Sequence, residues 1–475
     1  MNPWLIGLLA LTALRLAAAA LLPVAPDEAY YWIWGRNLQP GYLDHPPMVG
    51  LWIAAGTGLL GDNPLGIRLL GPLGLALASV AVARAGDALF PQSRPGKSAA
   101  LLLNAMPLTN AGAVLMTPDT PLVVFWCLAL WAAARLHATG DGRYWLAVGG
   151  FAGCALLSKY TAALFGAGLL LWLVADPSAR RWWRGAWLYL GGVAAVLLFL
   201  PVVAWNASHG WASFAKQGGR AGAGTEFGLR YVWELLGGQL ALASPVLFVI
   251  CALGIGVGVA DWARRRSGGV GLLLGLMLPA ALVFLWQATG SRVQGNWPAV
   301  LYPAACIAAA AFAAPRWQRI GAWIGGGMTL AILLQAAFSP IPLPRSADPT
   351  LARLAGWPEL AREVEAARAA AGADFVAAEE YGLAAELALH LPREVPVVAI
   401  SDRWDLFTLP EPPPGRTGLM LRSLRRGEGA PLWPGAVRVG EVLRGRDGVE
   451  AERYRLFQVE TPPGREPSAL LPRPR

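Results

Sequence analysis

Two acidic motifs follow the first apolar segment of the chain and carry its most unusual carboxylates. They read Pro26-Asp27-Glu28-Ala29-Tyr30-Tyr31-Trp32 and Tyr42-Leu43-Asp44-His45-Pro46-Pro47. Carboxylates beside long apolar segments are costly to keep charged, so we interpret them as functional. Asp27 could act as a general base or bind a substrate hydroxyl, with aromatic residues such as Tyr31 holding the motif at a membrane interface. The structural alternatives are helix caps formed by Asp27 or Asp44.

Three further motifs stand between later apolar segments. Asp119 lies in the turn Thr117-Pro118-Asp119-Thr120-Pro121, Lys159 and Tyr160 join two short apolar segments, and Arg292 precedes Asn296-Trp297. Lys159 and Arg292 could pair with a phosphate. The structural alternatives are a helix cap at Asp119 and a lysine that extends along the apolar surface to water. A loop over 206–217 adds His209 to the polar residues of this group.

Together, these residue types suit a sugar attached to a lipid phosphate. Cations bind phosphate, carboxylates accept hydrogen bonds from sugar hydroxyls, and aromatic rings stack on the apolar face of a sugar. The reaction that we expect is direct displacement at the anomeric carbon. A carboxylate would deprotonate the acceptor, and a cation would stabilise the departing phosphate.

The composition of the chain places most of it in a membrane. It is 55% hydrophobic and only 15% charged, with a mean hydropathy of +0.45, whereas an ordinary soluble protein is about 25% charged. The net charge of +9 comes largely from arginines between apolar segments. Membrane topology explains these arginines, so we expect no nucleic-acid partner. All four cysteines lie in apolar runs without metal-ligand spacing, and we expect no disulfides.

About eleven segments are candidates for spanning the membrane, each approaching the roughly 20 apolar residues that a span needs. They are 4–22, 64–90, 98–116, 121–136, 144–158, 161–175, 186–205, 231–260, 269–288, 297–314 and 319–340. The first segment lacks a basic leader and contains Arg15, so we predict a retained span rather than a signal peptide. The stretch 47–60 is too short to span and predicts an interfacial or re-entrant helix.

Lysine and arginine are enriched in every second loop between these spans, which predicts the orientation of the chain. The enriched loops contain Arg94 and Lys97, then Arg135 and Arg143, then Arg180, Arg181 and Arg184, then Arg264 to Arg266, and finally Arg316 and Arg319. The other loops carry the motifs above, and the first of them, 23–63, is acidic. We therefore expect a cytoplasmic N-terminus, with the motifs and everything after residue 340 outside.

The fold class that we predict is a polytopic all-α membrane protein with a small C-terminal α/β domain on the outer face. The membrane domain covers 1–340 and the outer domain 345–460. In the outer domain we expect helices over 350–371 and 380–391, and strands near 374–378, 396–400, 417–421, 437–443 and 452–459. The tail 461–475 is rich in Pro and Arg and predicts disorder.

The order of the motifs resembles the membrane glycosyltransferases of the GT-C fold. The Asp-Glu pair, Tyr-x-Asp-His-Pro-Pro, Thr-Pro-Asp-x-Pro, Ser-Lys-Tyr and Asn-x-x-His-x-Trp-x-Ser-Phe occur in this sequence in that order, all on one predicted side. They are similar to the bacterial branch of the dolichyl-phosphate-mannose protein mannosyltransferase-like family. This branch includes lipid A aminoarabinose transferases and lipopolysaccharide galacturonosyltransferases. The similarity covers about residues 1–310, and the C-terminal domain more weakly.

The resemblance implies an inverting transfer from a polyprenyl-phosphate sugar donor to a lipid A, glycolipid, glycan or protein acceptor. It implies a monomeric enzyme in a bacterial inner membrane, with a periplasmic C-terminal domain. Asp27 matches the acidic residue that engages the acceptor or acts as base. The residues expected to bind acceptor or sugar are Glu28, Tyr31, Asp44, His45, Asp119, Asn296 and Trp297.

Donor-phosphate binding is expected at Lys159, Tyr160 and Arg292. His45 stands where aminoarabinose transferases have lysine, and Tyr30 replaces an arginine of their first motif, so the phosphate grip of those enzymes is not expected here. Some relatives hold a metal near the acidic-His pair, which makes Asp44 with His209 a possible divalent-metal site. No multi-histidine cluster occurs, so no cofactor is certain.

Two other classes of protein could account for part of the sequence. A transporter or flippase for lipid-linked sugars would share the apolar spans, but transporters tend to have internal repeats and broken helices with polar residues at mid-membrane. This sequence has no evident repeat, and its polar motifs collect on one face. A non-catalytic scaffold with an outer binding domain would not explain why carboxylates recur in the loops on one side.

Overall fold

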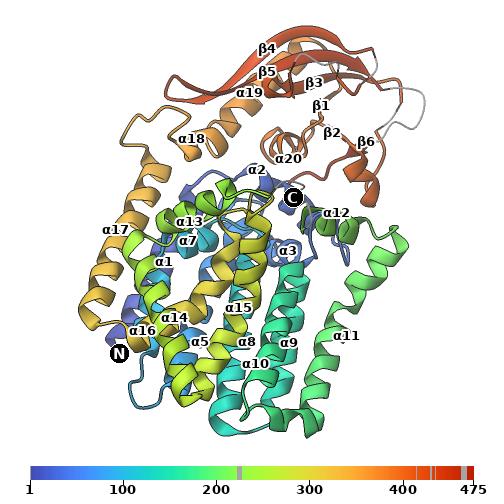
Figure 1. Ribbon diagram of the computed structural model, residues 1–475. Helices are drawn as coiled ribbons and strands as arrows, with labels where there is room; N and C mark the ends of the chain where they lie inside the picture. Colours follow the sequence, from blue (N-terminus) through green and yellow to red (C-terminus); the bar gives the residue numbers. More distant parts are fainter. Residues whose placement is uncertain (1, 222–226, 413, 428–430, 434, 462–467) are drawn as a thin grey trace. The chain divides into compact units, whose positions relative to one another are not determined.

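The computed structural model describes residues 2–221, 227–412, 414–427, 431–433, 435–461 and 468–475 (Figure 1). The chain forms two compact units. The first contains 1–17, 44–49 and 70–333, and the second contains 18–43, 50–69 and 334–475. This division differs from the contiguous domains predicted from the sequence, because most of the acidic first loop belongs to the same unit as the C-terminal region.

Apolar helices dominate the part of the chain before residue 340. Among the described residues, seven are long and apolar enough to cross a membrane: α1 (Pro3–Leu21), α4 with α5 (Pro64–Arg68, Leu70–Leu89), α8 (Asp119–Thr139), α11 (Ala186–Ser208), α14 (Pro245–Arg265), α15 (Gly268–Ala288) and α17 (Pro315–Phe338). Shorter apolar helices are α3 (Met48–Leu60), α9 (Tyr144–Ser158), η1 with α10 (Tyr160–Ala162, Ala163–Ala175) and η3 with α16 (Trp297–Leu301, Tyr302–Phe312). The chain is therefore a multi-pass membrane protein, as predicted, and the exact number of crossings stays a prediction.

Two of the predicted spans are broken in the structure. The segment 98–116 forms α6 (Gly96–Ala105) and α7 (Pro107–Val114), because Pro107 has no N–H to continue the helix. The segment 231–260 forms α13 (Arg230–Leu242) and α14, which are separated at Ser244, a residue with φ of +69° that precedes Pro245. Part of the predicted loop 206–230 is also helical, as α12 (Ala212–Ala221), while 222–226 lie outside the described residues. One further turn, η2 (Arg180–Arg184), precedes α11.

Close helix packing fixes the ends of α8 and α9 in the first unit. In Figure 1, α8 packs on α5 and α9, and α9 packs on α11. Small residues allow this approach, since a Cβ on Gly149 would collide with the backbone of Gly191. Because α8 begins at Asp119 and α9 ends just before Lys159, the two residues lie at the same end of adjacent helices.

The second unit contains a six-stranded mixed sheet in the order β4-β5-β3-β1-β2-β6 (Figure 1). The strands are β1 (Phe375–Ala378), β2 (Val397–Ile400), β3 (Thr417–Ser423), β4 (Val437–Arg446), β5 (Val449–Glu460) and β6 (Ser468–Leu470). Strand β1 pairs in parallel with β2 and β3, while the outer pairs are antiparallel. One face buries Phe375, Val398, Met420 and Phe457 in a hydrophobic cluster.

Helices complete the second unit and correct two predictions. Besides α4 and most of α3, they are α2 (Pro26–Arg36), α18 (Pro349–Arg353), α19 (Trp357–Ala370), α20 (Tyr381–His390), η4 (Asp402–Leu406) and η5 (Leu424–Arg426). The predicted helix 350–371 is split into α18 and α19 at Gly356, which has φ of +81°. Disorder over 461–475 is wrong for its last part, where β6 pairs with β2; residues 462–467 lie outside the described residues.

Candidate active site

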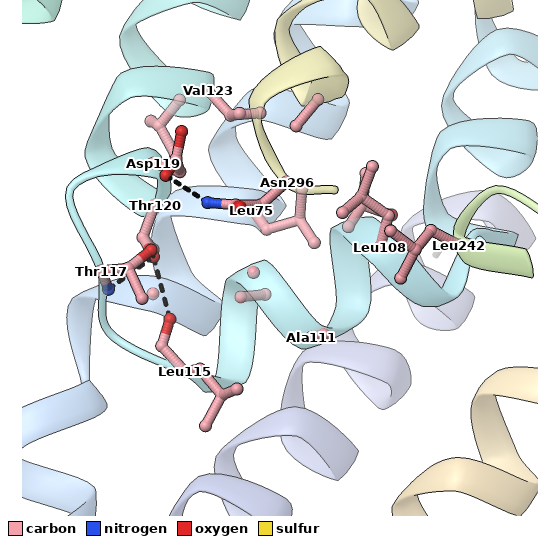
Figure 2. A pocket seen from close by; sticks show the side chains of 16 residues that line it. Leu75, Leu108, Ala111, Leu115, Thr117, Asp119, Thr120, Val123, Leu242 and Asn296 are labelled. Atoms are coloured by element: carbon pink, nitrogen blue, oxygen red, sulfur yellow. Dashed lines mark hydrogen bonds between the residues drawn. The ribbon is translucent and has the colours of Figure 1, made fainter. Parts of the chain in front are cut away.

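Four residues predicted from three separate motifs form one polar cluster in the first unit. Lys159 Nζ lies 2.8 Å from both carboxylate oxygens of Asp119. Asn296 Nδ2 donates a hydrogen bond to Oδ2 of the same carboxylate at 2.7 Å (Figure 2). The Lys159 ammonium also lies 5.4 Å from the centre of the Trp297 ring, within cation–π range.

This cluster decides between the alternatives for Asp119 and Lys159. Lys159 is only 6% exposed, so it does not extend to water along the apolar surface. Pro118, not Asp119, occupies the N-cap position of α8, and the Asp119 carboxylate neutralises Lys159 instead. A lysine ammonium has three N–H donors, so an ammonium that serves two oxygens of Asp119 keeps one donor for another ligand.

An apolar cavity of about 260 Å³ adjoins the cluster. Figure 2 shows Asp119 and Asn296 at one part of its wall, with Leu108 and Leu242 among the apolar residues that line the rest. Ligand pockets for whole small molecules are typically about 300–1,000 Å³. The cavity therefore suits a short segment of an apolar chain whose polar end lies near Asp119.

Asp44 forms a second ion pair of the first unit. Its Oδ1 lies 2.8 Å from Lys216 Nζ, and Gln217 Nε2 donates to its backbone oxygen at 2.5 Å. Both partners belong to α12, so a segment predicted as loop is the helix that holds the Asp44-His45 turn. His45 follows Asp44 and is half-buried. The acceptor or sugar roles of Asp44 and His45 stay predictions.

Tyr160 is fixed by α12 and His209 by α11, rather than by the Asp119 cluster. The Tyr160 hydroxyl is hydrogen-bonded to Ser213 Oγ at 2.7 Å. His209 ends α11 and stacks on Trp205, with ring centres 4.2 Å apart. Its Nδ1 lies 2.8 Å from the Trp205 backbone oxygen, which can only accept, so Nδ1 carries the proton.

The possible metal site at Asp44 and His209 gains no support from these contacts. Asp44 engages Lys216, and His209 engages Trp205. In the part of the chain that the structure describes, no group of three or more His, Cys, Asp or Glu is arranged to hold a metal ion.

Arg292 lies on the surface and pairs with Glu234 of α13. Its side chain is 66% exposed, so solvent screens this pair and a charged ligand could replace Glu234 at little cost. The structure shows no contact between Arg292 and the Asp119 cluster among the described residues. Its donor-phosphate role stays a prediction.

In the second unit, Glu28 is buried in an ion pair rather than open to a substrate. It is 1% exposed, and both of its oxygens receive hydrogen bonds from Arg68 at 2.7 and 2.5 Å. The Arg68 guanidinium also donates to the backbone oxygens of Ala19, Leu22 and Pro23. Glu28 further accepts from the Ala25 N–H at 3.0 Å and so closes the first turn of α2. These contacts give Glu28 a structural role, and its acceptor or sugar role stays a prediction.

Asp27 has a different environment from its neighbour. It is half-buried in the first turn of α2, and its Oδ1 accepts a hydrogen bond of 2.8 Å from the Tyr381 hydroxyl of α20. Ala25 is the N-cap residue, so Asp27 is not the helix cap. Within the described residues Asp27 joins no ion pair, whereas Glu28, Asp44 and Asp119 each pair with a cation. Asp27 thus retains carboxylate capacity for a ligand.

Aromatic residues and a cation surround the Asp27–Tyr381 bond. The ring of Tyr30 lies 4.7 Å from that of Tyr381, and the Arg403 guanidinium lies 4.2 Å from the Tyr381 ring centre. Helix α20 can approach α2 closely because Gly382 has no side chain. A Cβ at this position would lie only 2.7 Å from Pro26 Cβ. Tyr31 is 8% exposed and packs edge-on against Trp34, which gives it a packing role.

Sequence reasoning missed four residues that organise these sites. Arg68 is a cation inside an apolar stretch, a signal that could have identified it. Lys216 stood in a noted motif but had no assigned partner. Tyr381 and Arg403 lie more than 350 residues from Asp27 along the chain, and no local pattern marks them.

Comparison with known proteins supports the family suggested by the motifs. Residues 44–205 match the family described as dolichyl-phosphate-mannose-protein mannosyltransferase. The chain is 28% identical over 367 residues to the lipid A galacturonosyltransferase RgtD of Rhizobium johnstonii, which covers 76% of each chain. It is 27% identical over 330 residues to undecaprenyl phosphate-alpha-4-amino-4-deoxy-L-arabinose arabinosyl transferase 1 of Pseudomonas fluorescens, covering 60% of this chain and 55% of that one.

The fold is shared with a solved structure over nearly the whole length. ArnT from Cupriavidus metallidurans, in a crystal structure bound to undecaprenyl phosphate, superposes with a TM-score of 0.67 at 12% identity and covers 96% of this chain and 98% of ArnT. The protein is a membrane glycosyltransferase of the GT-C fold. Within that class, residues 44–205 are similar to the mannosyltransferase family named above.

Proposed function

We propose that the chain transfers a sugar from a polyprenyl-phosphate donor to a lipid, glycan or protein acceptor, with inversion at the anomeric carbon. The relatives named above support a lipid-linked donor and a lipid acceptor. The observation that supports a catalytic role in this chain is the set of partners of the Asp27 carboxylate. Its carboxylate is held by one neutral donor, Tyr381, and by no cation among the described residues.

In the reaction, an acceptor hydroxyl oxygen attacks the anomeric carbon of the donor sugar. The bond between that carbon and the phosphate oxygen breaks, and its electron pair leaves with the phosphate. The proton of the acceptor hydroxyl passes to Asp27, which acts as general base. One displacement of this kind inverts the configuration of the sugar.

A carboxylate suits this task only if it is anchored yet still able to accept a proton. The Tyr381 hydroxyl orients Oδ1 of Asp27, and this neutral partner leaves the carboxylate oxygens able to accept from a ligand. Glu28, by contrast, gives both oxygens to Arg68. Glu28 therefore positions α2, and Asp27 acts as the general base.

The departing phosphate needs positive charge close to the reacting carbon. Arg403 lies over the Tyr381 ring, whose hydroxyl binds Asp27, so we add it to the candidate phosphate ligands. The predicted roles of Lys159, Tyr160 and Arg292 in donor-phosphate binding stand beside it. For Lys159, the donor N–H not used by Asp119 would make that contact.

The apolar cavity beside Asp119 supports a lipid-linked ligand. A sugar phosphate alone has no apolar surface to bury against this wall. The isoprenoid chain of a polyprenyl phosphate does, and its burial away from water is favourable. We place the motif-bearing ends of α8 and α9 outside the cytoplasmic membrane of a bacterium, with the N-terminus in the cytoplasm. The alternating basic loops support this orientation.

The proposal is tested by reconstituting the full chain in proteoliposomes with a polyprenyl-phosphate sugar that is radiolabelled in the sugar. The expected product is a covalent sugar adduct of an added glycolipid or glycan acceptor, detected by mass spectrometry. A flippase would move the intact donor across the bilayer without any adduct. That result would overturn the proposal, as would the absence of both adduct and donor consumption with every acceptor class.

A further inference from the structure

A large cavity lies at the ends of α5, α8 and α9 that are remote from Asp119 and Lys159. It measures about 1,020 Å³ and is lined by parts of α1, α5, α6, α8 and α9. The stretch of α8 from Asp119 to Arg135 spans about 24 Å at 1.5 Å per residue, close to the roughly 30 Å of a hydrocarbon core. The cavity thus faces the membrane interface opposite that of the Asp119 cluster.

Four cations converge on this cavity, which we name the basic cavity. They are Arg84 of α5, Arg94 and Lys97 at the α5–α6 connection, and Arg135 of α8, against a single acid, Asp87. Asp87 already accepts a hydrogen bond from the Gly96 N–H at 2.8 Å. Within the described ranges none of the four cations forms an ion pair, so the cavity has an excess of about three positive charges.

Topology alone does not require this convergence. Cytoplasmic loops need lysines and arginines somewhere near the membrane, and other basic residues of the same side meet that need separately. Arg265 pairs with Asp261 of its own helix, and Arg266 and Arg181 lie over Trp262 and Trp182. The cations of the basic cavity come instead from separate elements and line one space.

The walls of the basic cavity combine charge with apolar and aromatic surface. Leu77 of α5 is 51% exposed, and Trp131 and Tyr144 line the cavity beside Arg135. The Arg135 guanidinium is 5.7 Å from the Tyr144 ring centre, and its Nε donates to the Tyr144 hydroxyl at 3.4 Å. This leaves its two terminal nitrogens to bind an anion in a fork. Cations at a membrane interface beside an exposed leucine suit a phosphate that carries acyl chains.

We propose that the basic cavity binds the headgroup of an anionic phospholipid, with its phosphate oxygens on Arg84, Arg94, Lys97 and Arg135 and its acyl chains along the Leu77 side. The volume exceeds what one phosphate needs, and the charge excess favours a headgroup with two phosphates over one. The bound lipid would fix the connection between α5 and α6 to α8. This site is separate from the proposed transfer chemistry and does not depend on it.

The test uses native mass spectrometry of the full chain released from nanodiscs of phosphatidylcholine with added cardiolipin or phosphatidylglycerol. The wild-type chain should retain anionic lipid, cardiolipin more strongly than phosphatidylglycerol. Removing two cations with Arg94→Gln and Lys97→Gln should weaken retention about 30-fold, which corresponds to about 1 kcal/mol for each basic residue near the surface. These two positions are exposed, so their replacement leaves the helices intact.

The matched control is Arg264→Gln with Arg265→Gln, which removes the same charge from the last turn of α14 on the same side. The control should retain anionic lipid as the wild type does, and an equal loss in both variants would overturn the site in favour of a general surface charge. Competition separates the two sources of phosphate. Displacement of the lipid by millimolar inorganic phosphate or glycerol phosphate would overturn the lipid assignment and indicate a site for a soluble phosphate. Unchanged retention in the Arg94 and Lys97 variant would overturn the site itself.

Discussion

Lys159 Nζ lies 2.8 Å from both carboxylate oxygens of Asp119, although the two residues are separated by 40 positions in the sequence. The sequence suggested separate roles for them, sugar binding for Asp119 and phosphate binding for Lys159. Their geometry makes them one buried unit that also holds Asn296 and Trp297. Any role for Lys159 in binding the donor therefore depends on Asp119.

Replacing Lys159 alone should destabilise the protein strongly. Lys159→Met leaves the Asp119 carboxylate buried with Asn296 as its remaining polar partner, and breaking a buried pair in this way costs about 3–5 kcal/mol. The apparent melting temperature in detergent should fall clearly. Asp119→Leu combined with Lys159→Met removes both charges and should recover much of the loss.

The exposed pair of Arg143 and Asp141 is the matched control, since its arginine is 75% exposed. Arg143→Met should leave the melting temperature unchanged. A Lys159→Met variant as stable as the wild type would contradict the buried pair. If the double variant is stable but no longer binds the donor, the Asp119–Lys159 pair takes part in donor binding.

The Arg68–Glu28 pair should be intolerant of a conservative change. Arg68→Lys keeps the charge, but one ammonium cannot reach both Glu28 oxygens and three backbone carbonyls as the guanidinium does. We expect a lower melting temperature and easier proteolysis around α2. Arg36→Lys, at a more exposed position on the same helix, should behave as the wild type. Equal stability of the two lysine variants would show that the hydrogen bonds of the Arg68 guanidinium do not stabilise the fold.

Much of the membrane architecture follows from the sequence because long apolar segments and basic loops have few other solutions. Spans such as 186–205 correspond closely to helices such as α11. The breaks at Pro107 and Ser244 were missed because overall hydropathy is insensitive to one residue that lacks an N–H or has a left-handed backbone.

The partners of the site residues could not be predicted in the same way. Asp27, Asp44 and Asp119 were identified by their position beside apolar segments, yet nothing local shows that Tyr381 binds the first and Lys216 the second. Those partners depend on tertiary packing. The ion pair of Glu28 was missed for the same reason, since its burial by Arg68 is invisible in the motif.

Acid should weaken the second unit through Asp348, which is 1% exposed. Burial on its own raises the pKa of Asp348, but hydrogen bonds from Thr350 and Leu351 and the contact with Arg446 outweigh it and lower that pKa to about 2. Because the folded pKa lies below the unfolded value of about 3.9, this carboxylate stabilises the fold above about pH 4. Its contribution is lost as the pH falls towards 2.

Asp348→Asn keeps a capping oxygen but removes the charge, so it should lower the melting temperature at pH 5 and have less effect at pH 2.5. Circular dichroism of the full chain in detergent measures both values. Glu359→Gln, at an exposed pair with Arg362, is the control. Its effect on the melting temperature should be small at both pH values. The same loss at both pH values would show that the charge of Asp348 is not responsible.

Tyr381 should matter for rate more than for stability. Tyr381→Phe removes the hydroxyl that binds Asp27 but keeps the ring that packs on Tyr30 and Arg403. A hydrogen bond to a charged group contributes about 1.5–3 kcal/mol, so kcat/KM should fall about 10- to 100-fold at a nearly unchanged melting temperature. Tyr454→Phe, in β5 of the same unit, should leave kcat/KM unaltered. An unaltered rate in Tyr381→Phe would remove Tyr381 from the site.

The most direct test of the central claim is the rate of sugar transfer by Asp27→Asn in proteoliposomes with a polyprenyl-phosphate sugar. The asparagine keeps the size of the side chain and can still accept a hydrogen bond from Tyr381, but it cannot take up the proton of the acceptor. We predict a loss of about 10²- to 10⁴-fold in kcat, with donor binding and melting temperature near those of the wild type. Wild-type transfer by Asp27→Asn would contradict the assignment of Asp27 as the base.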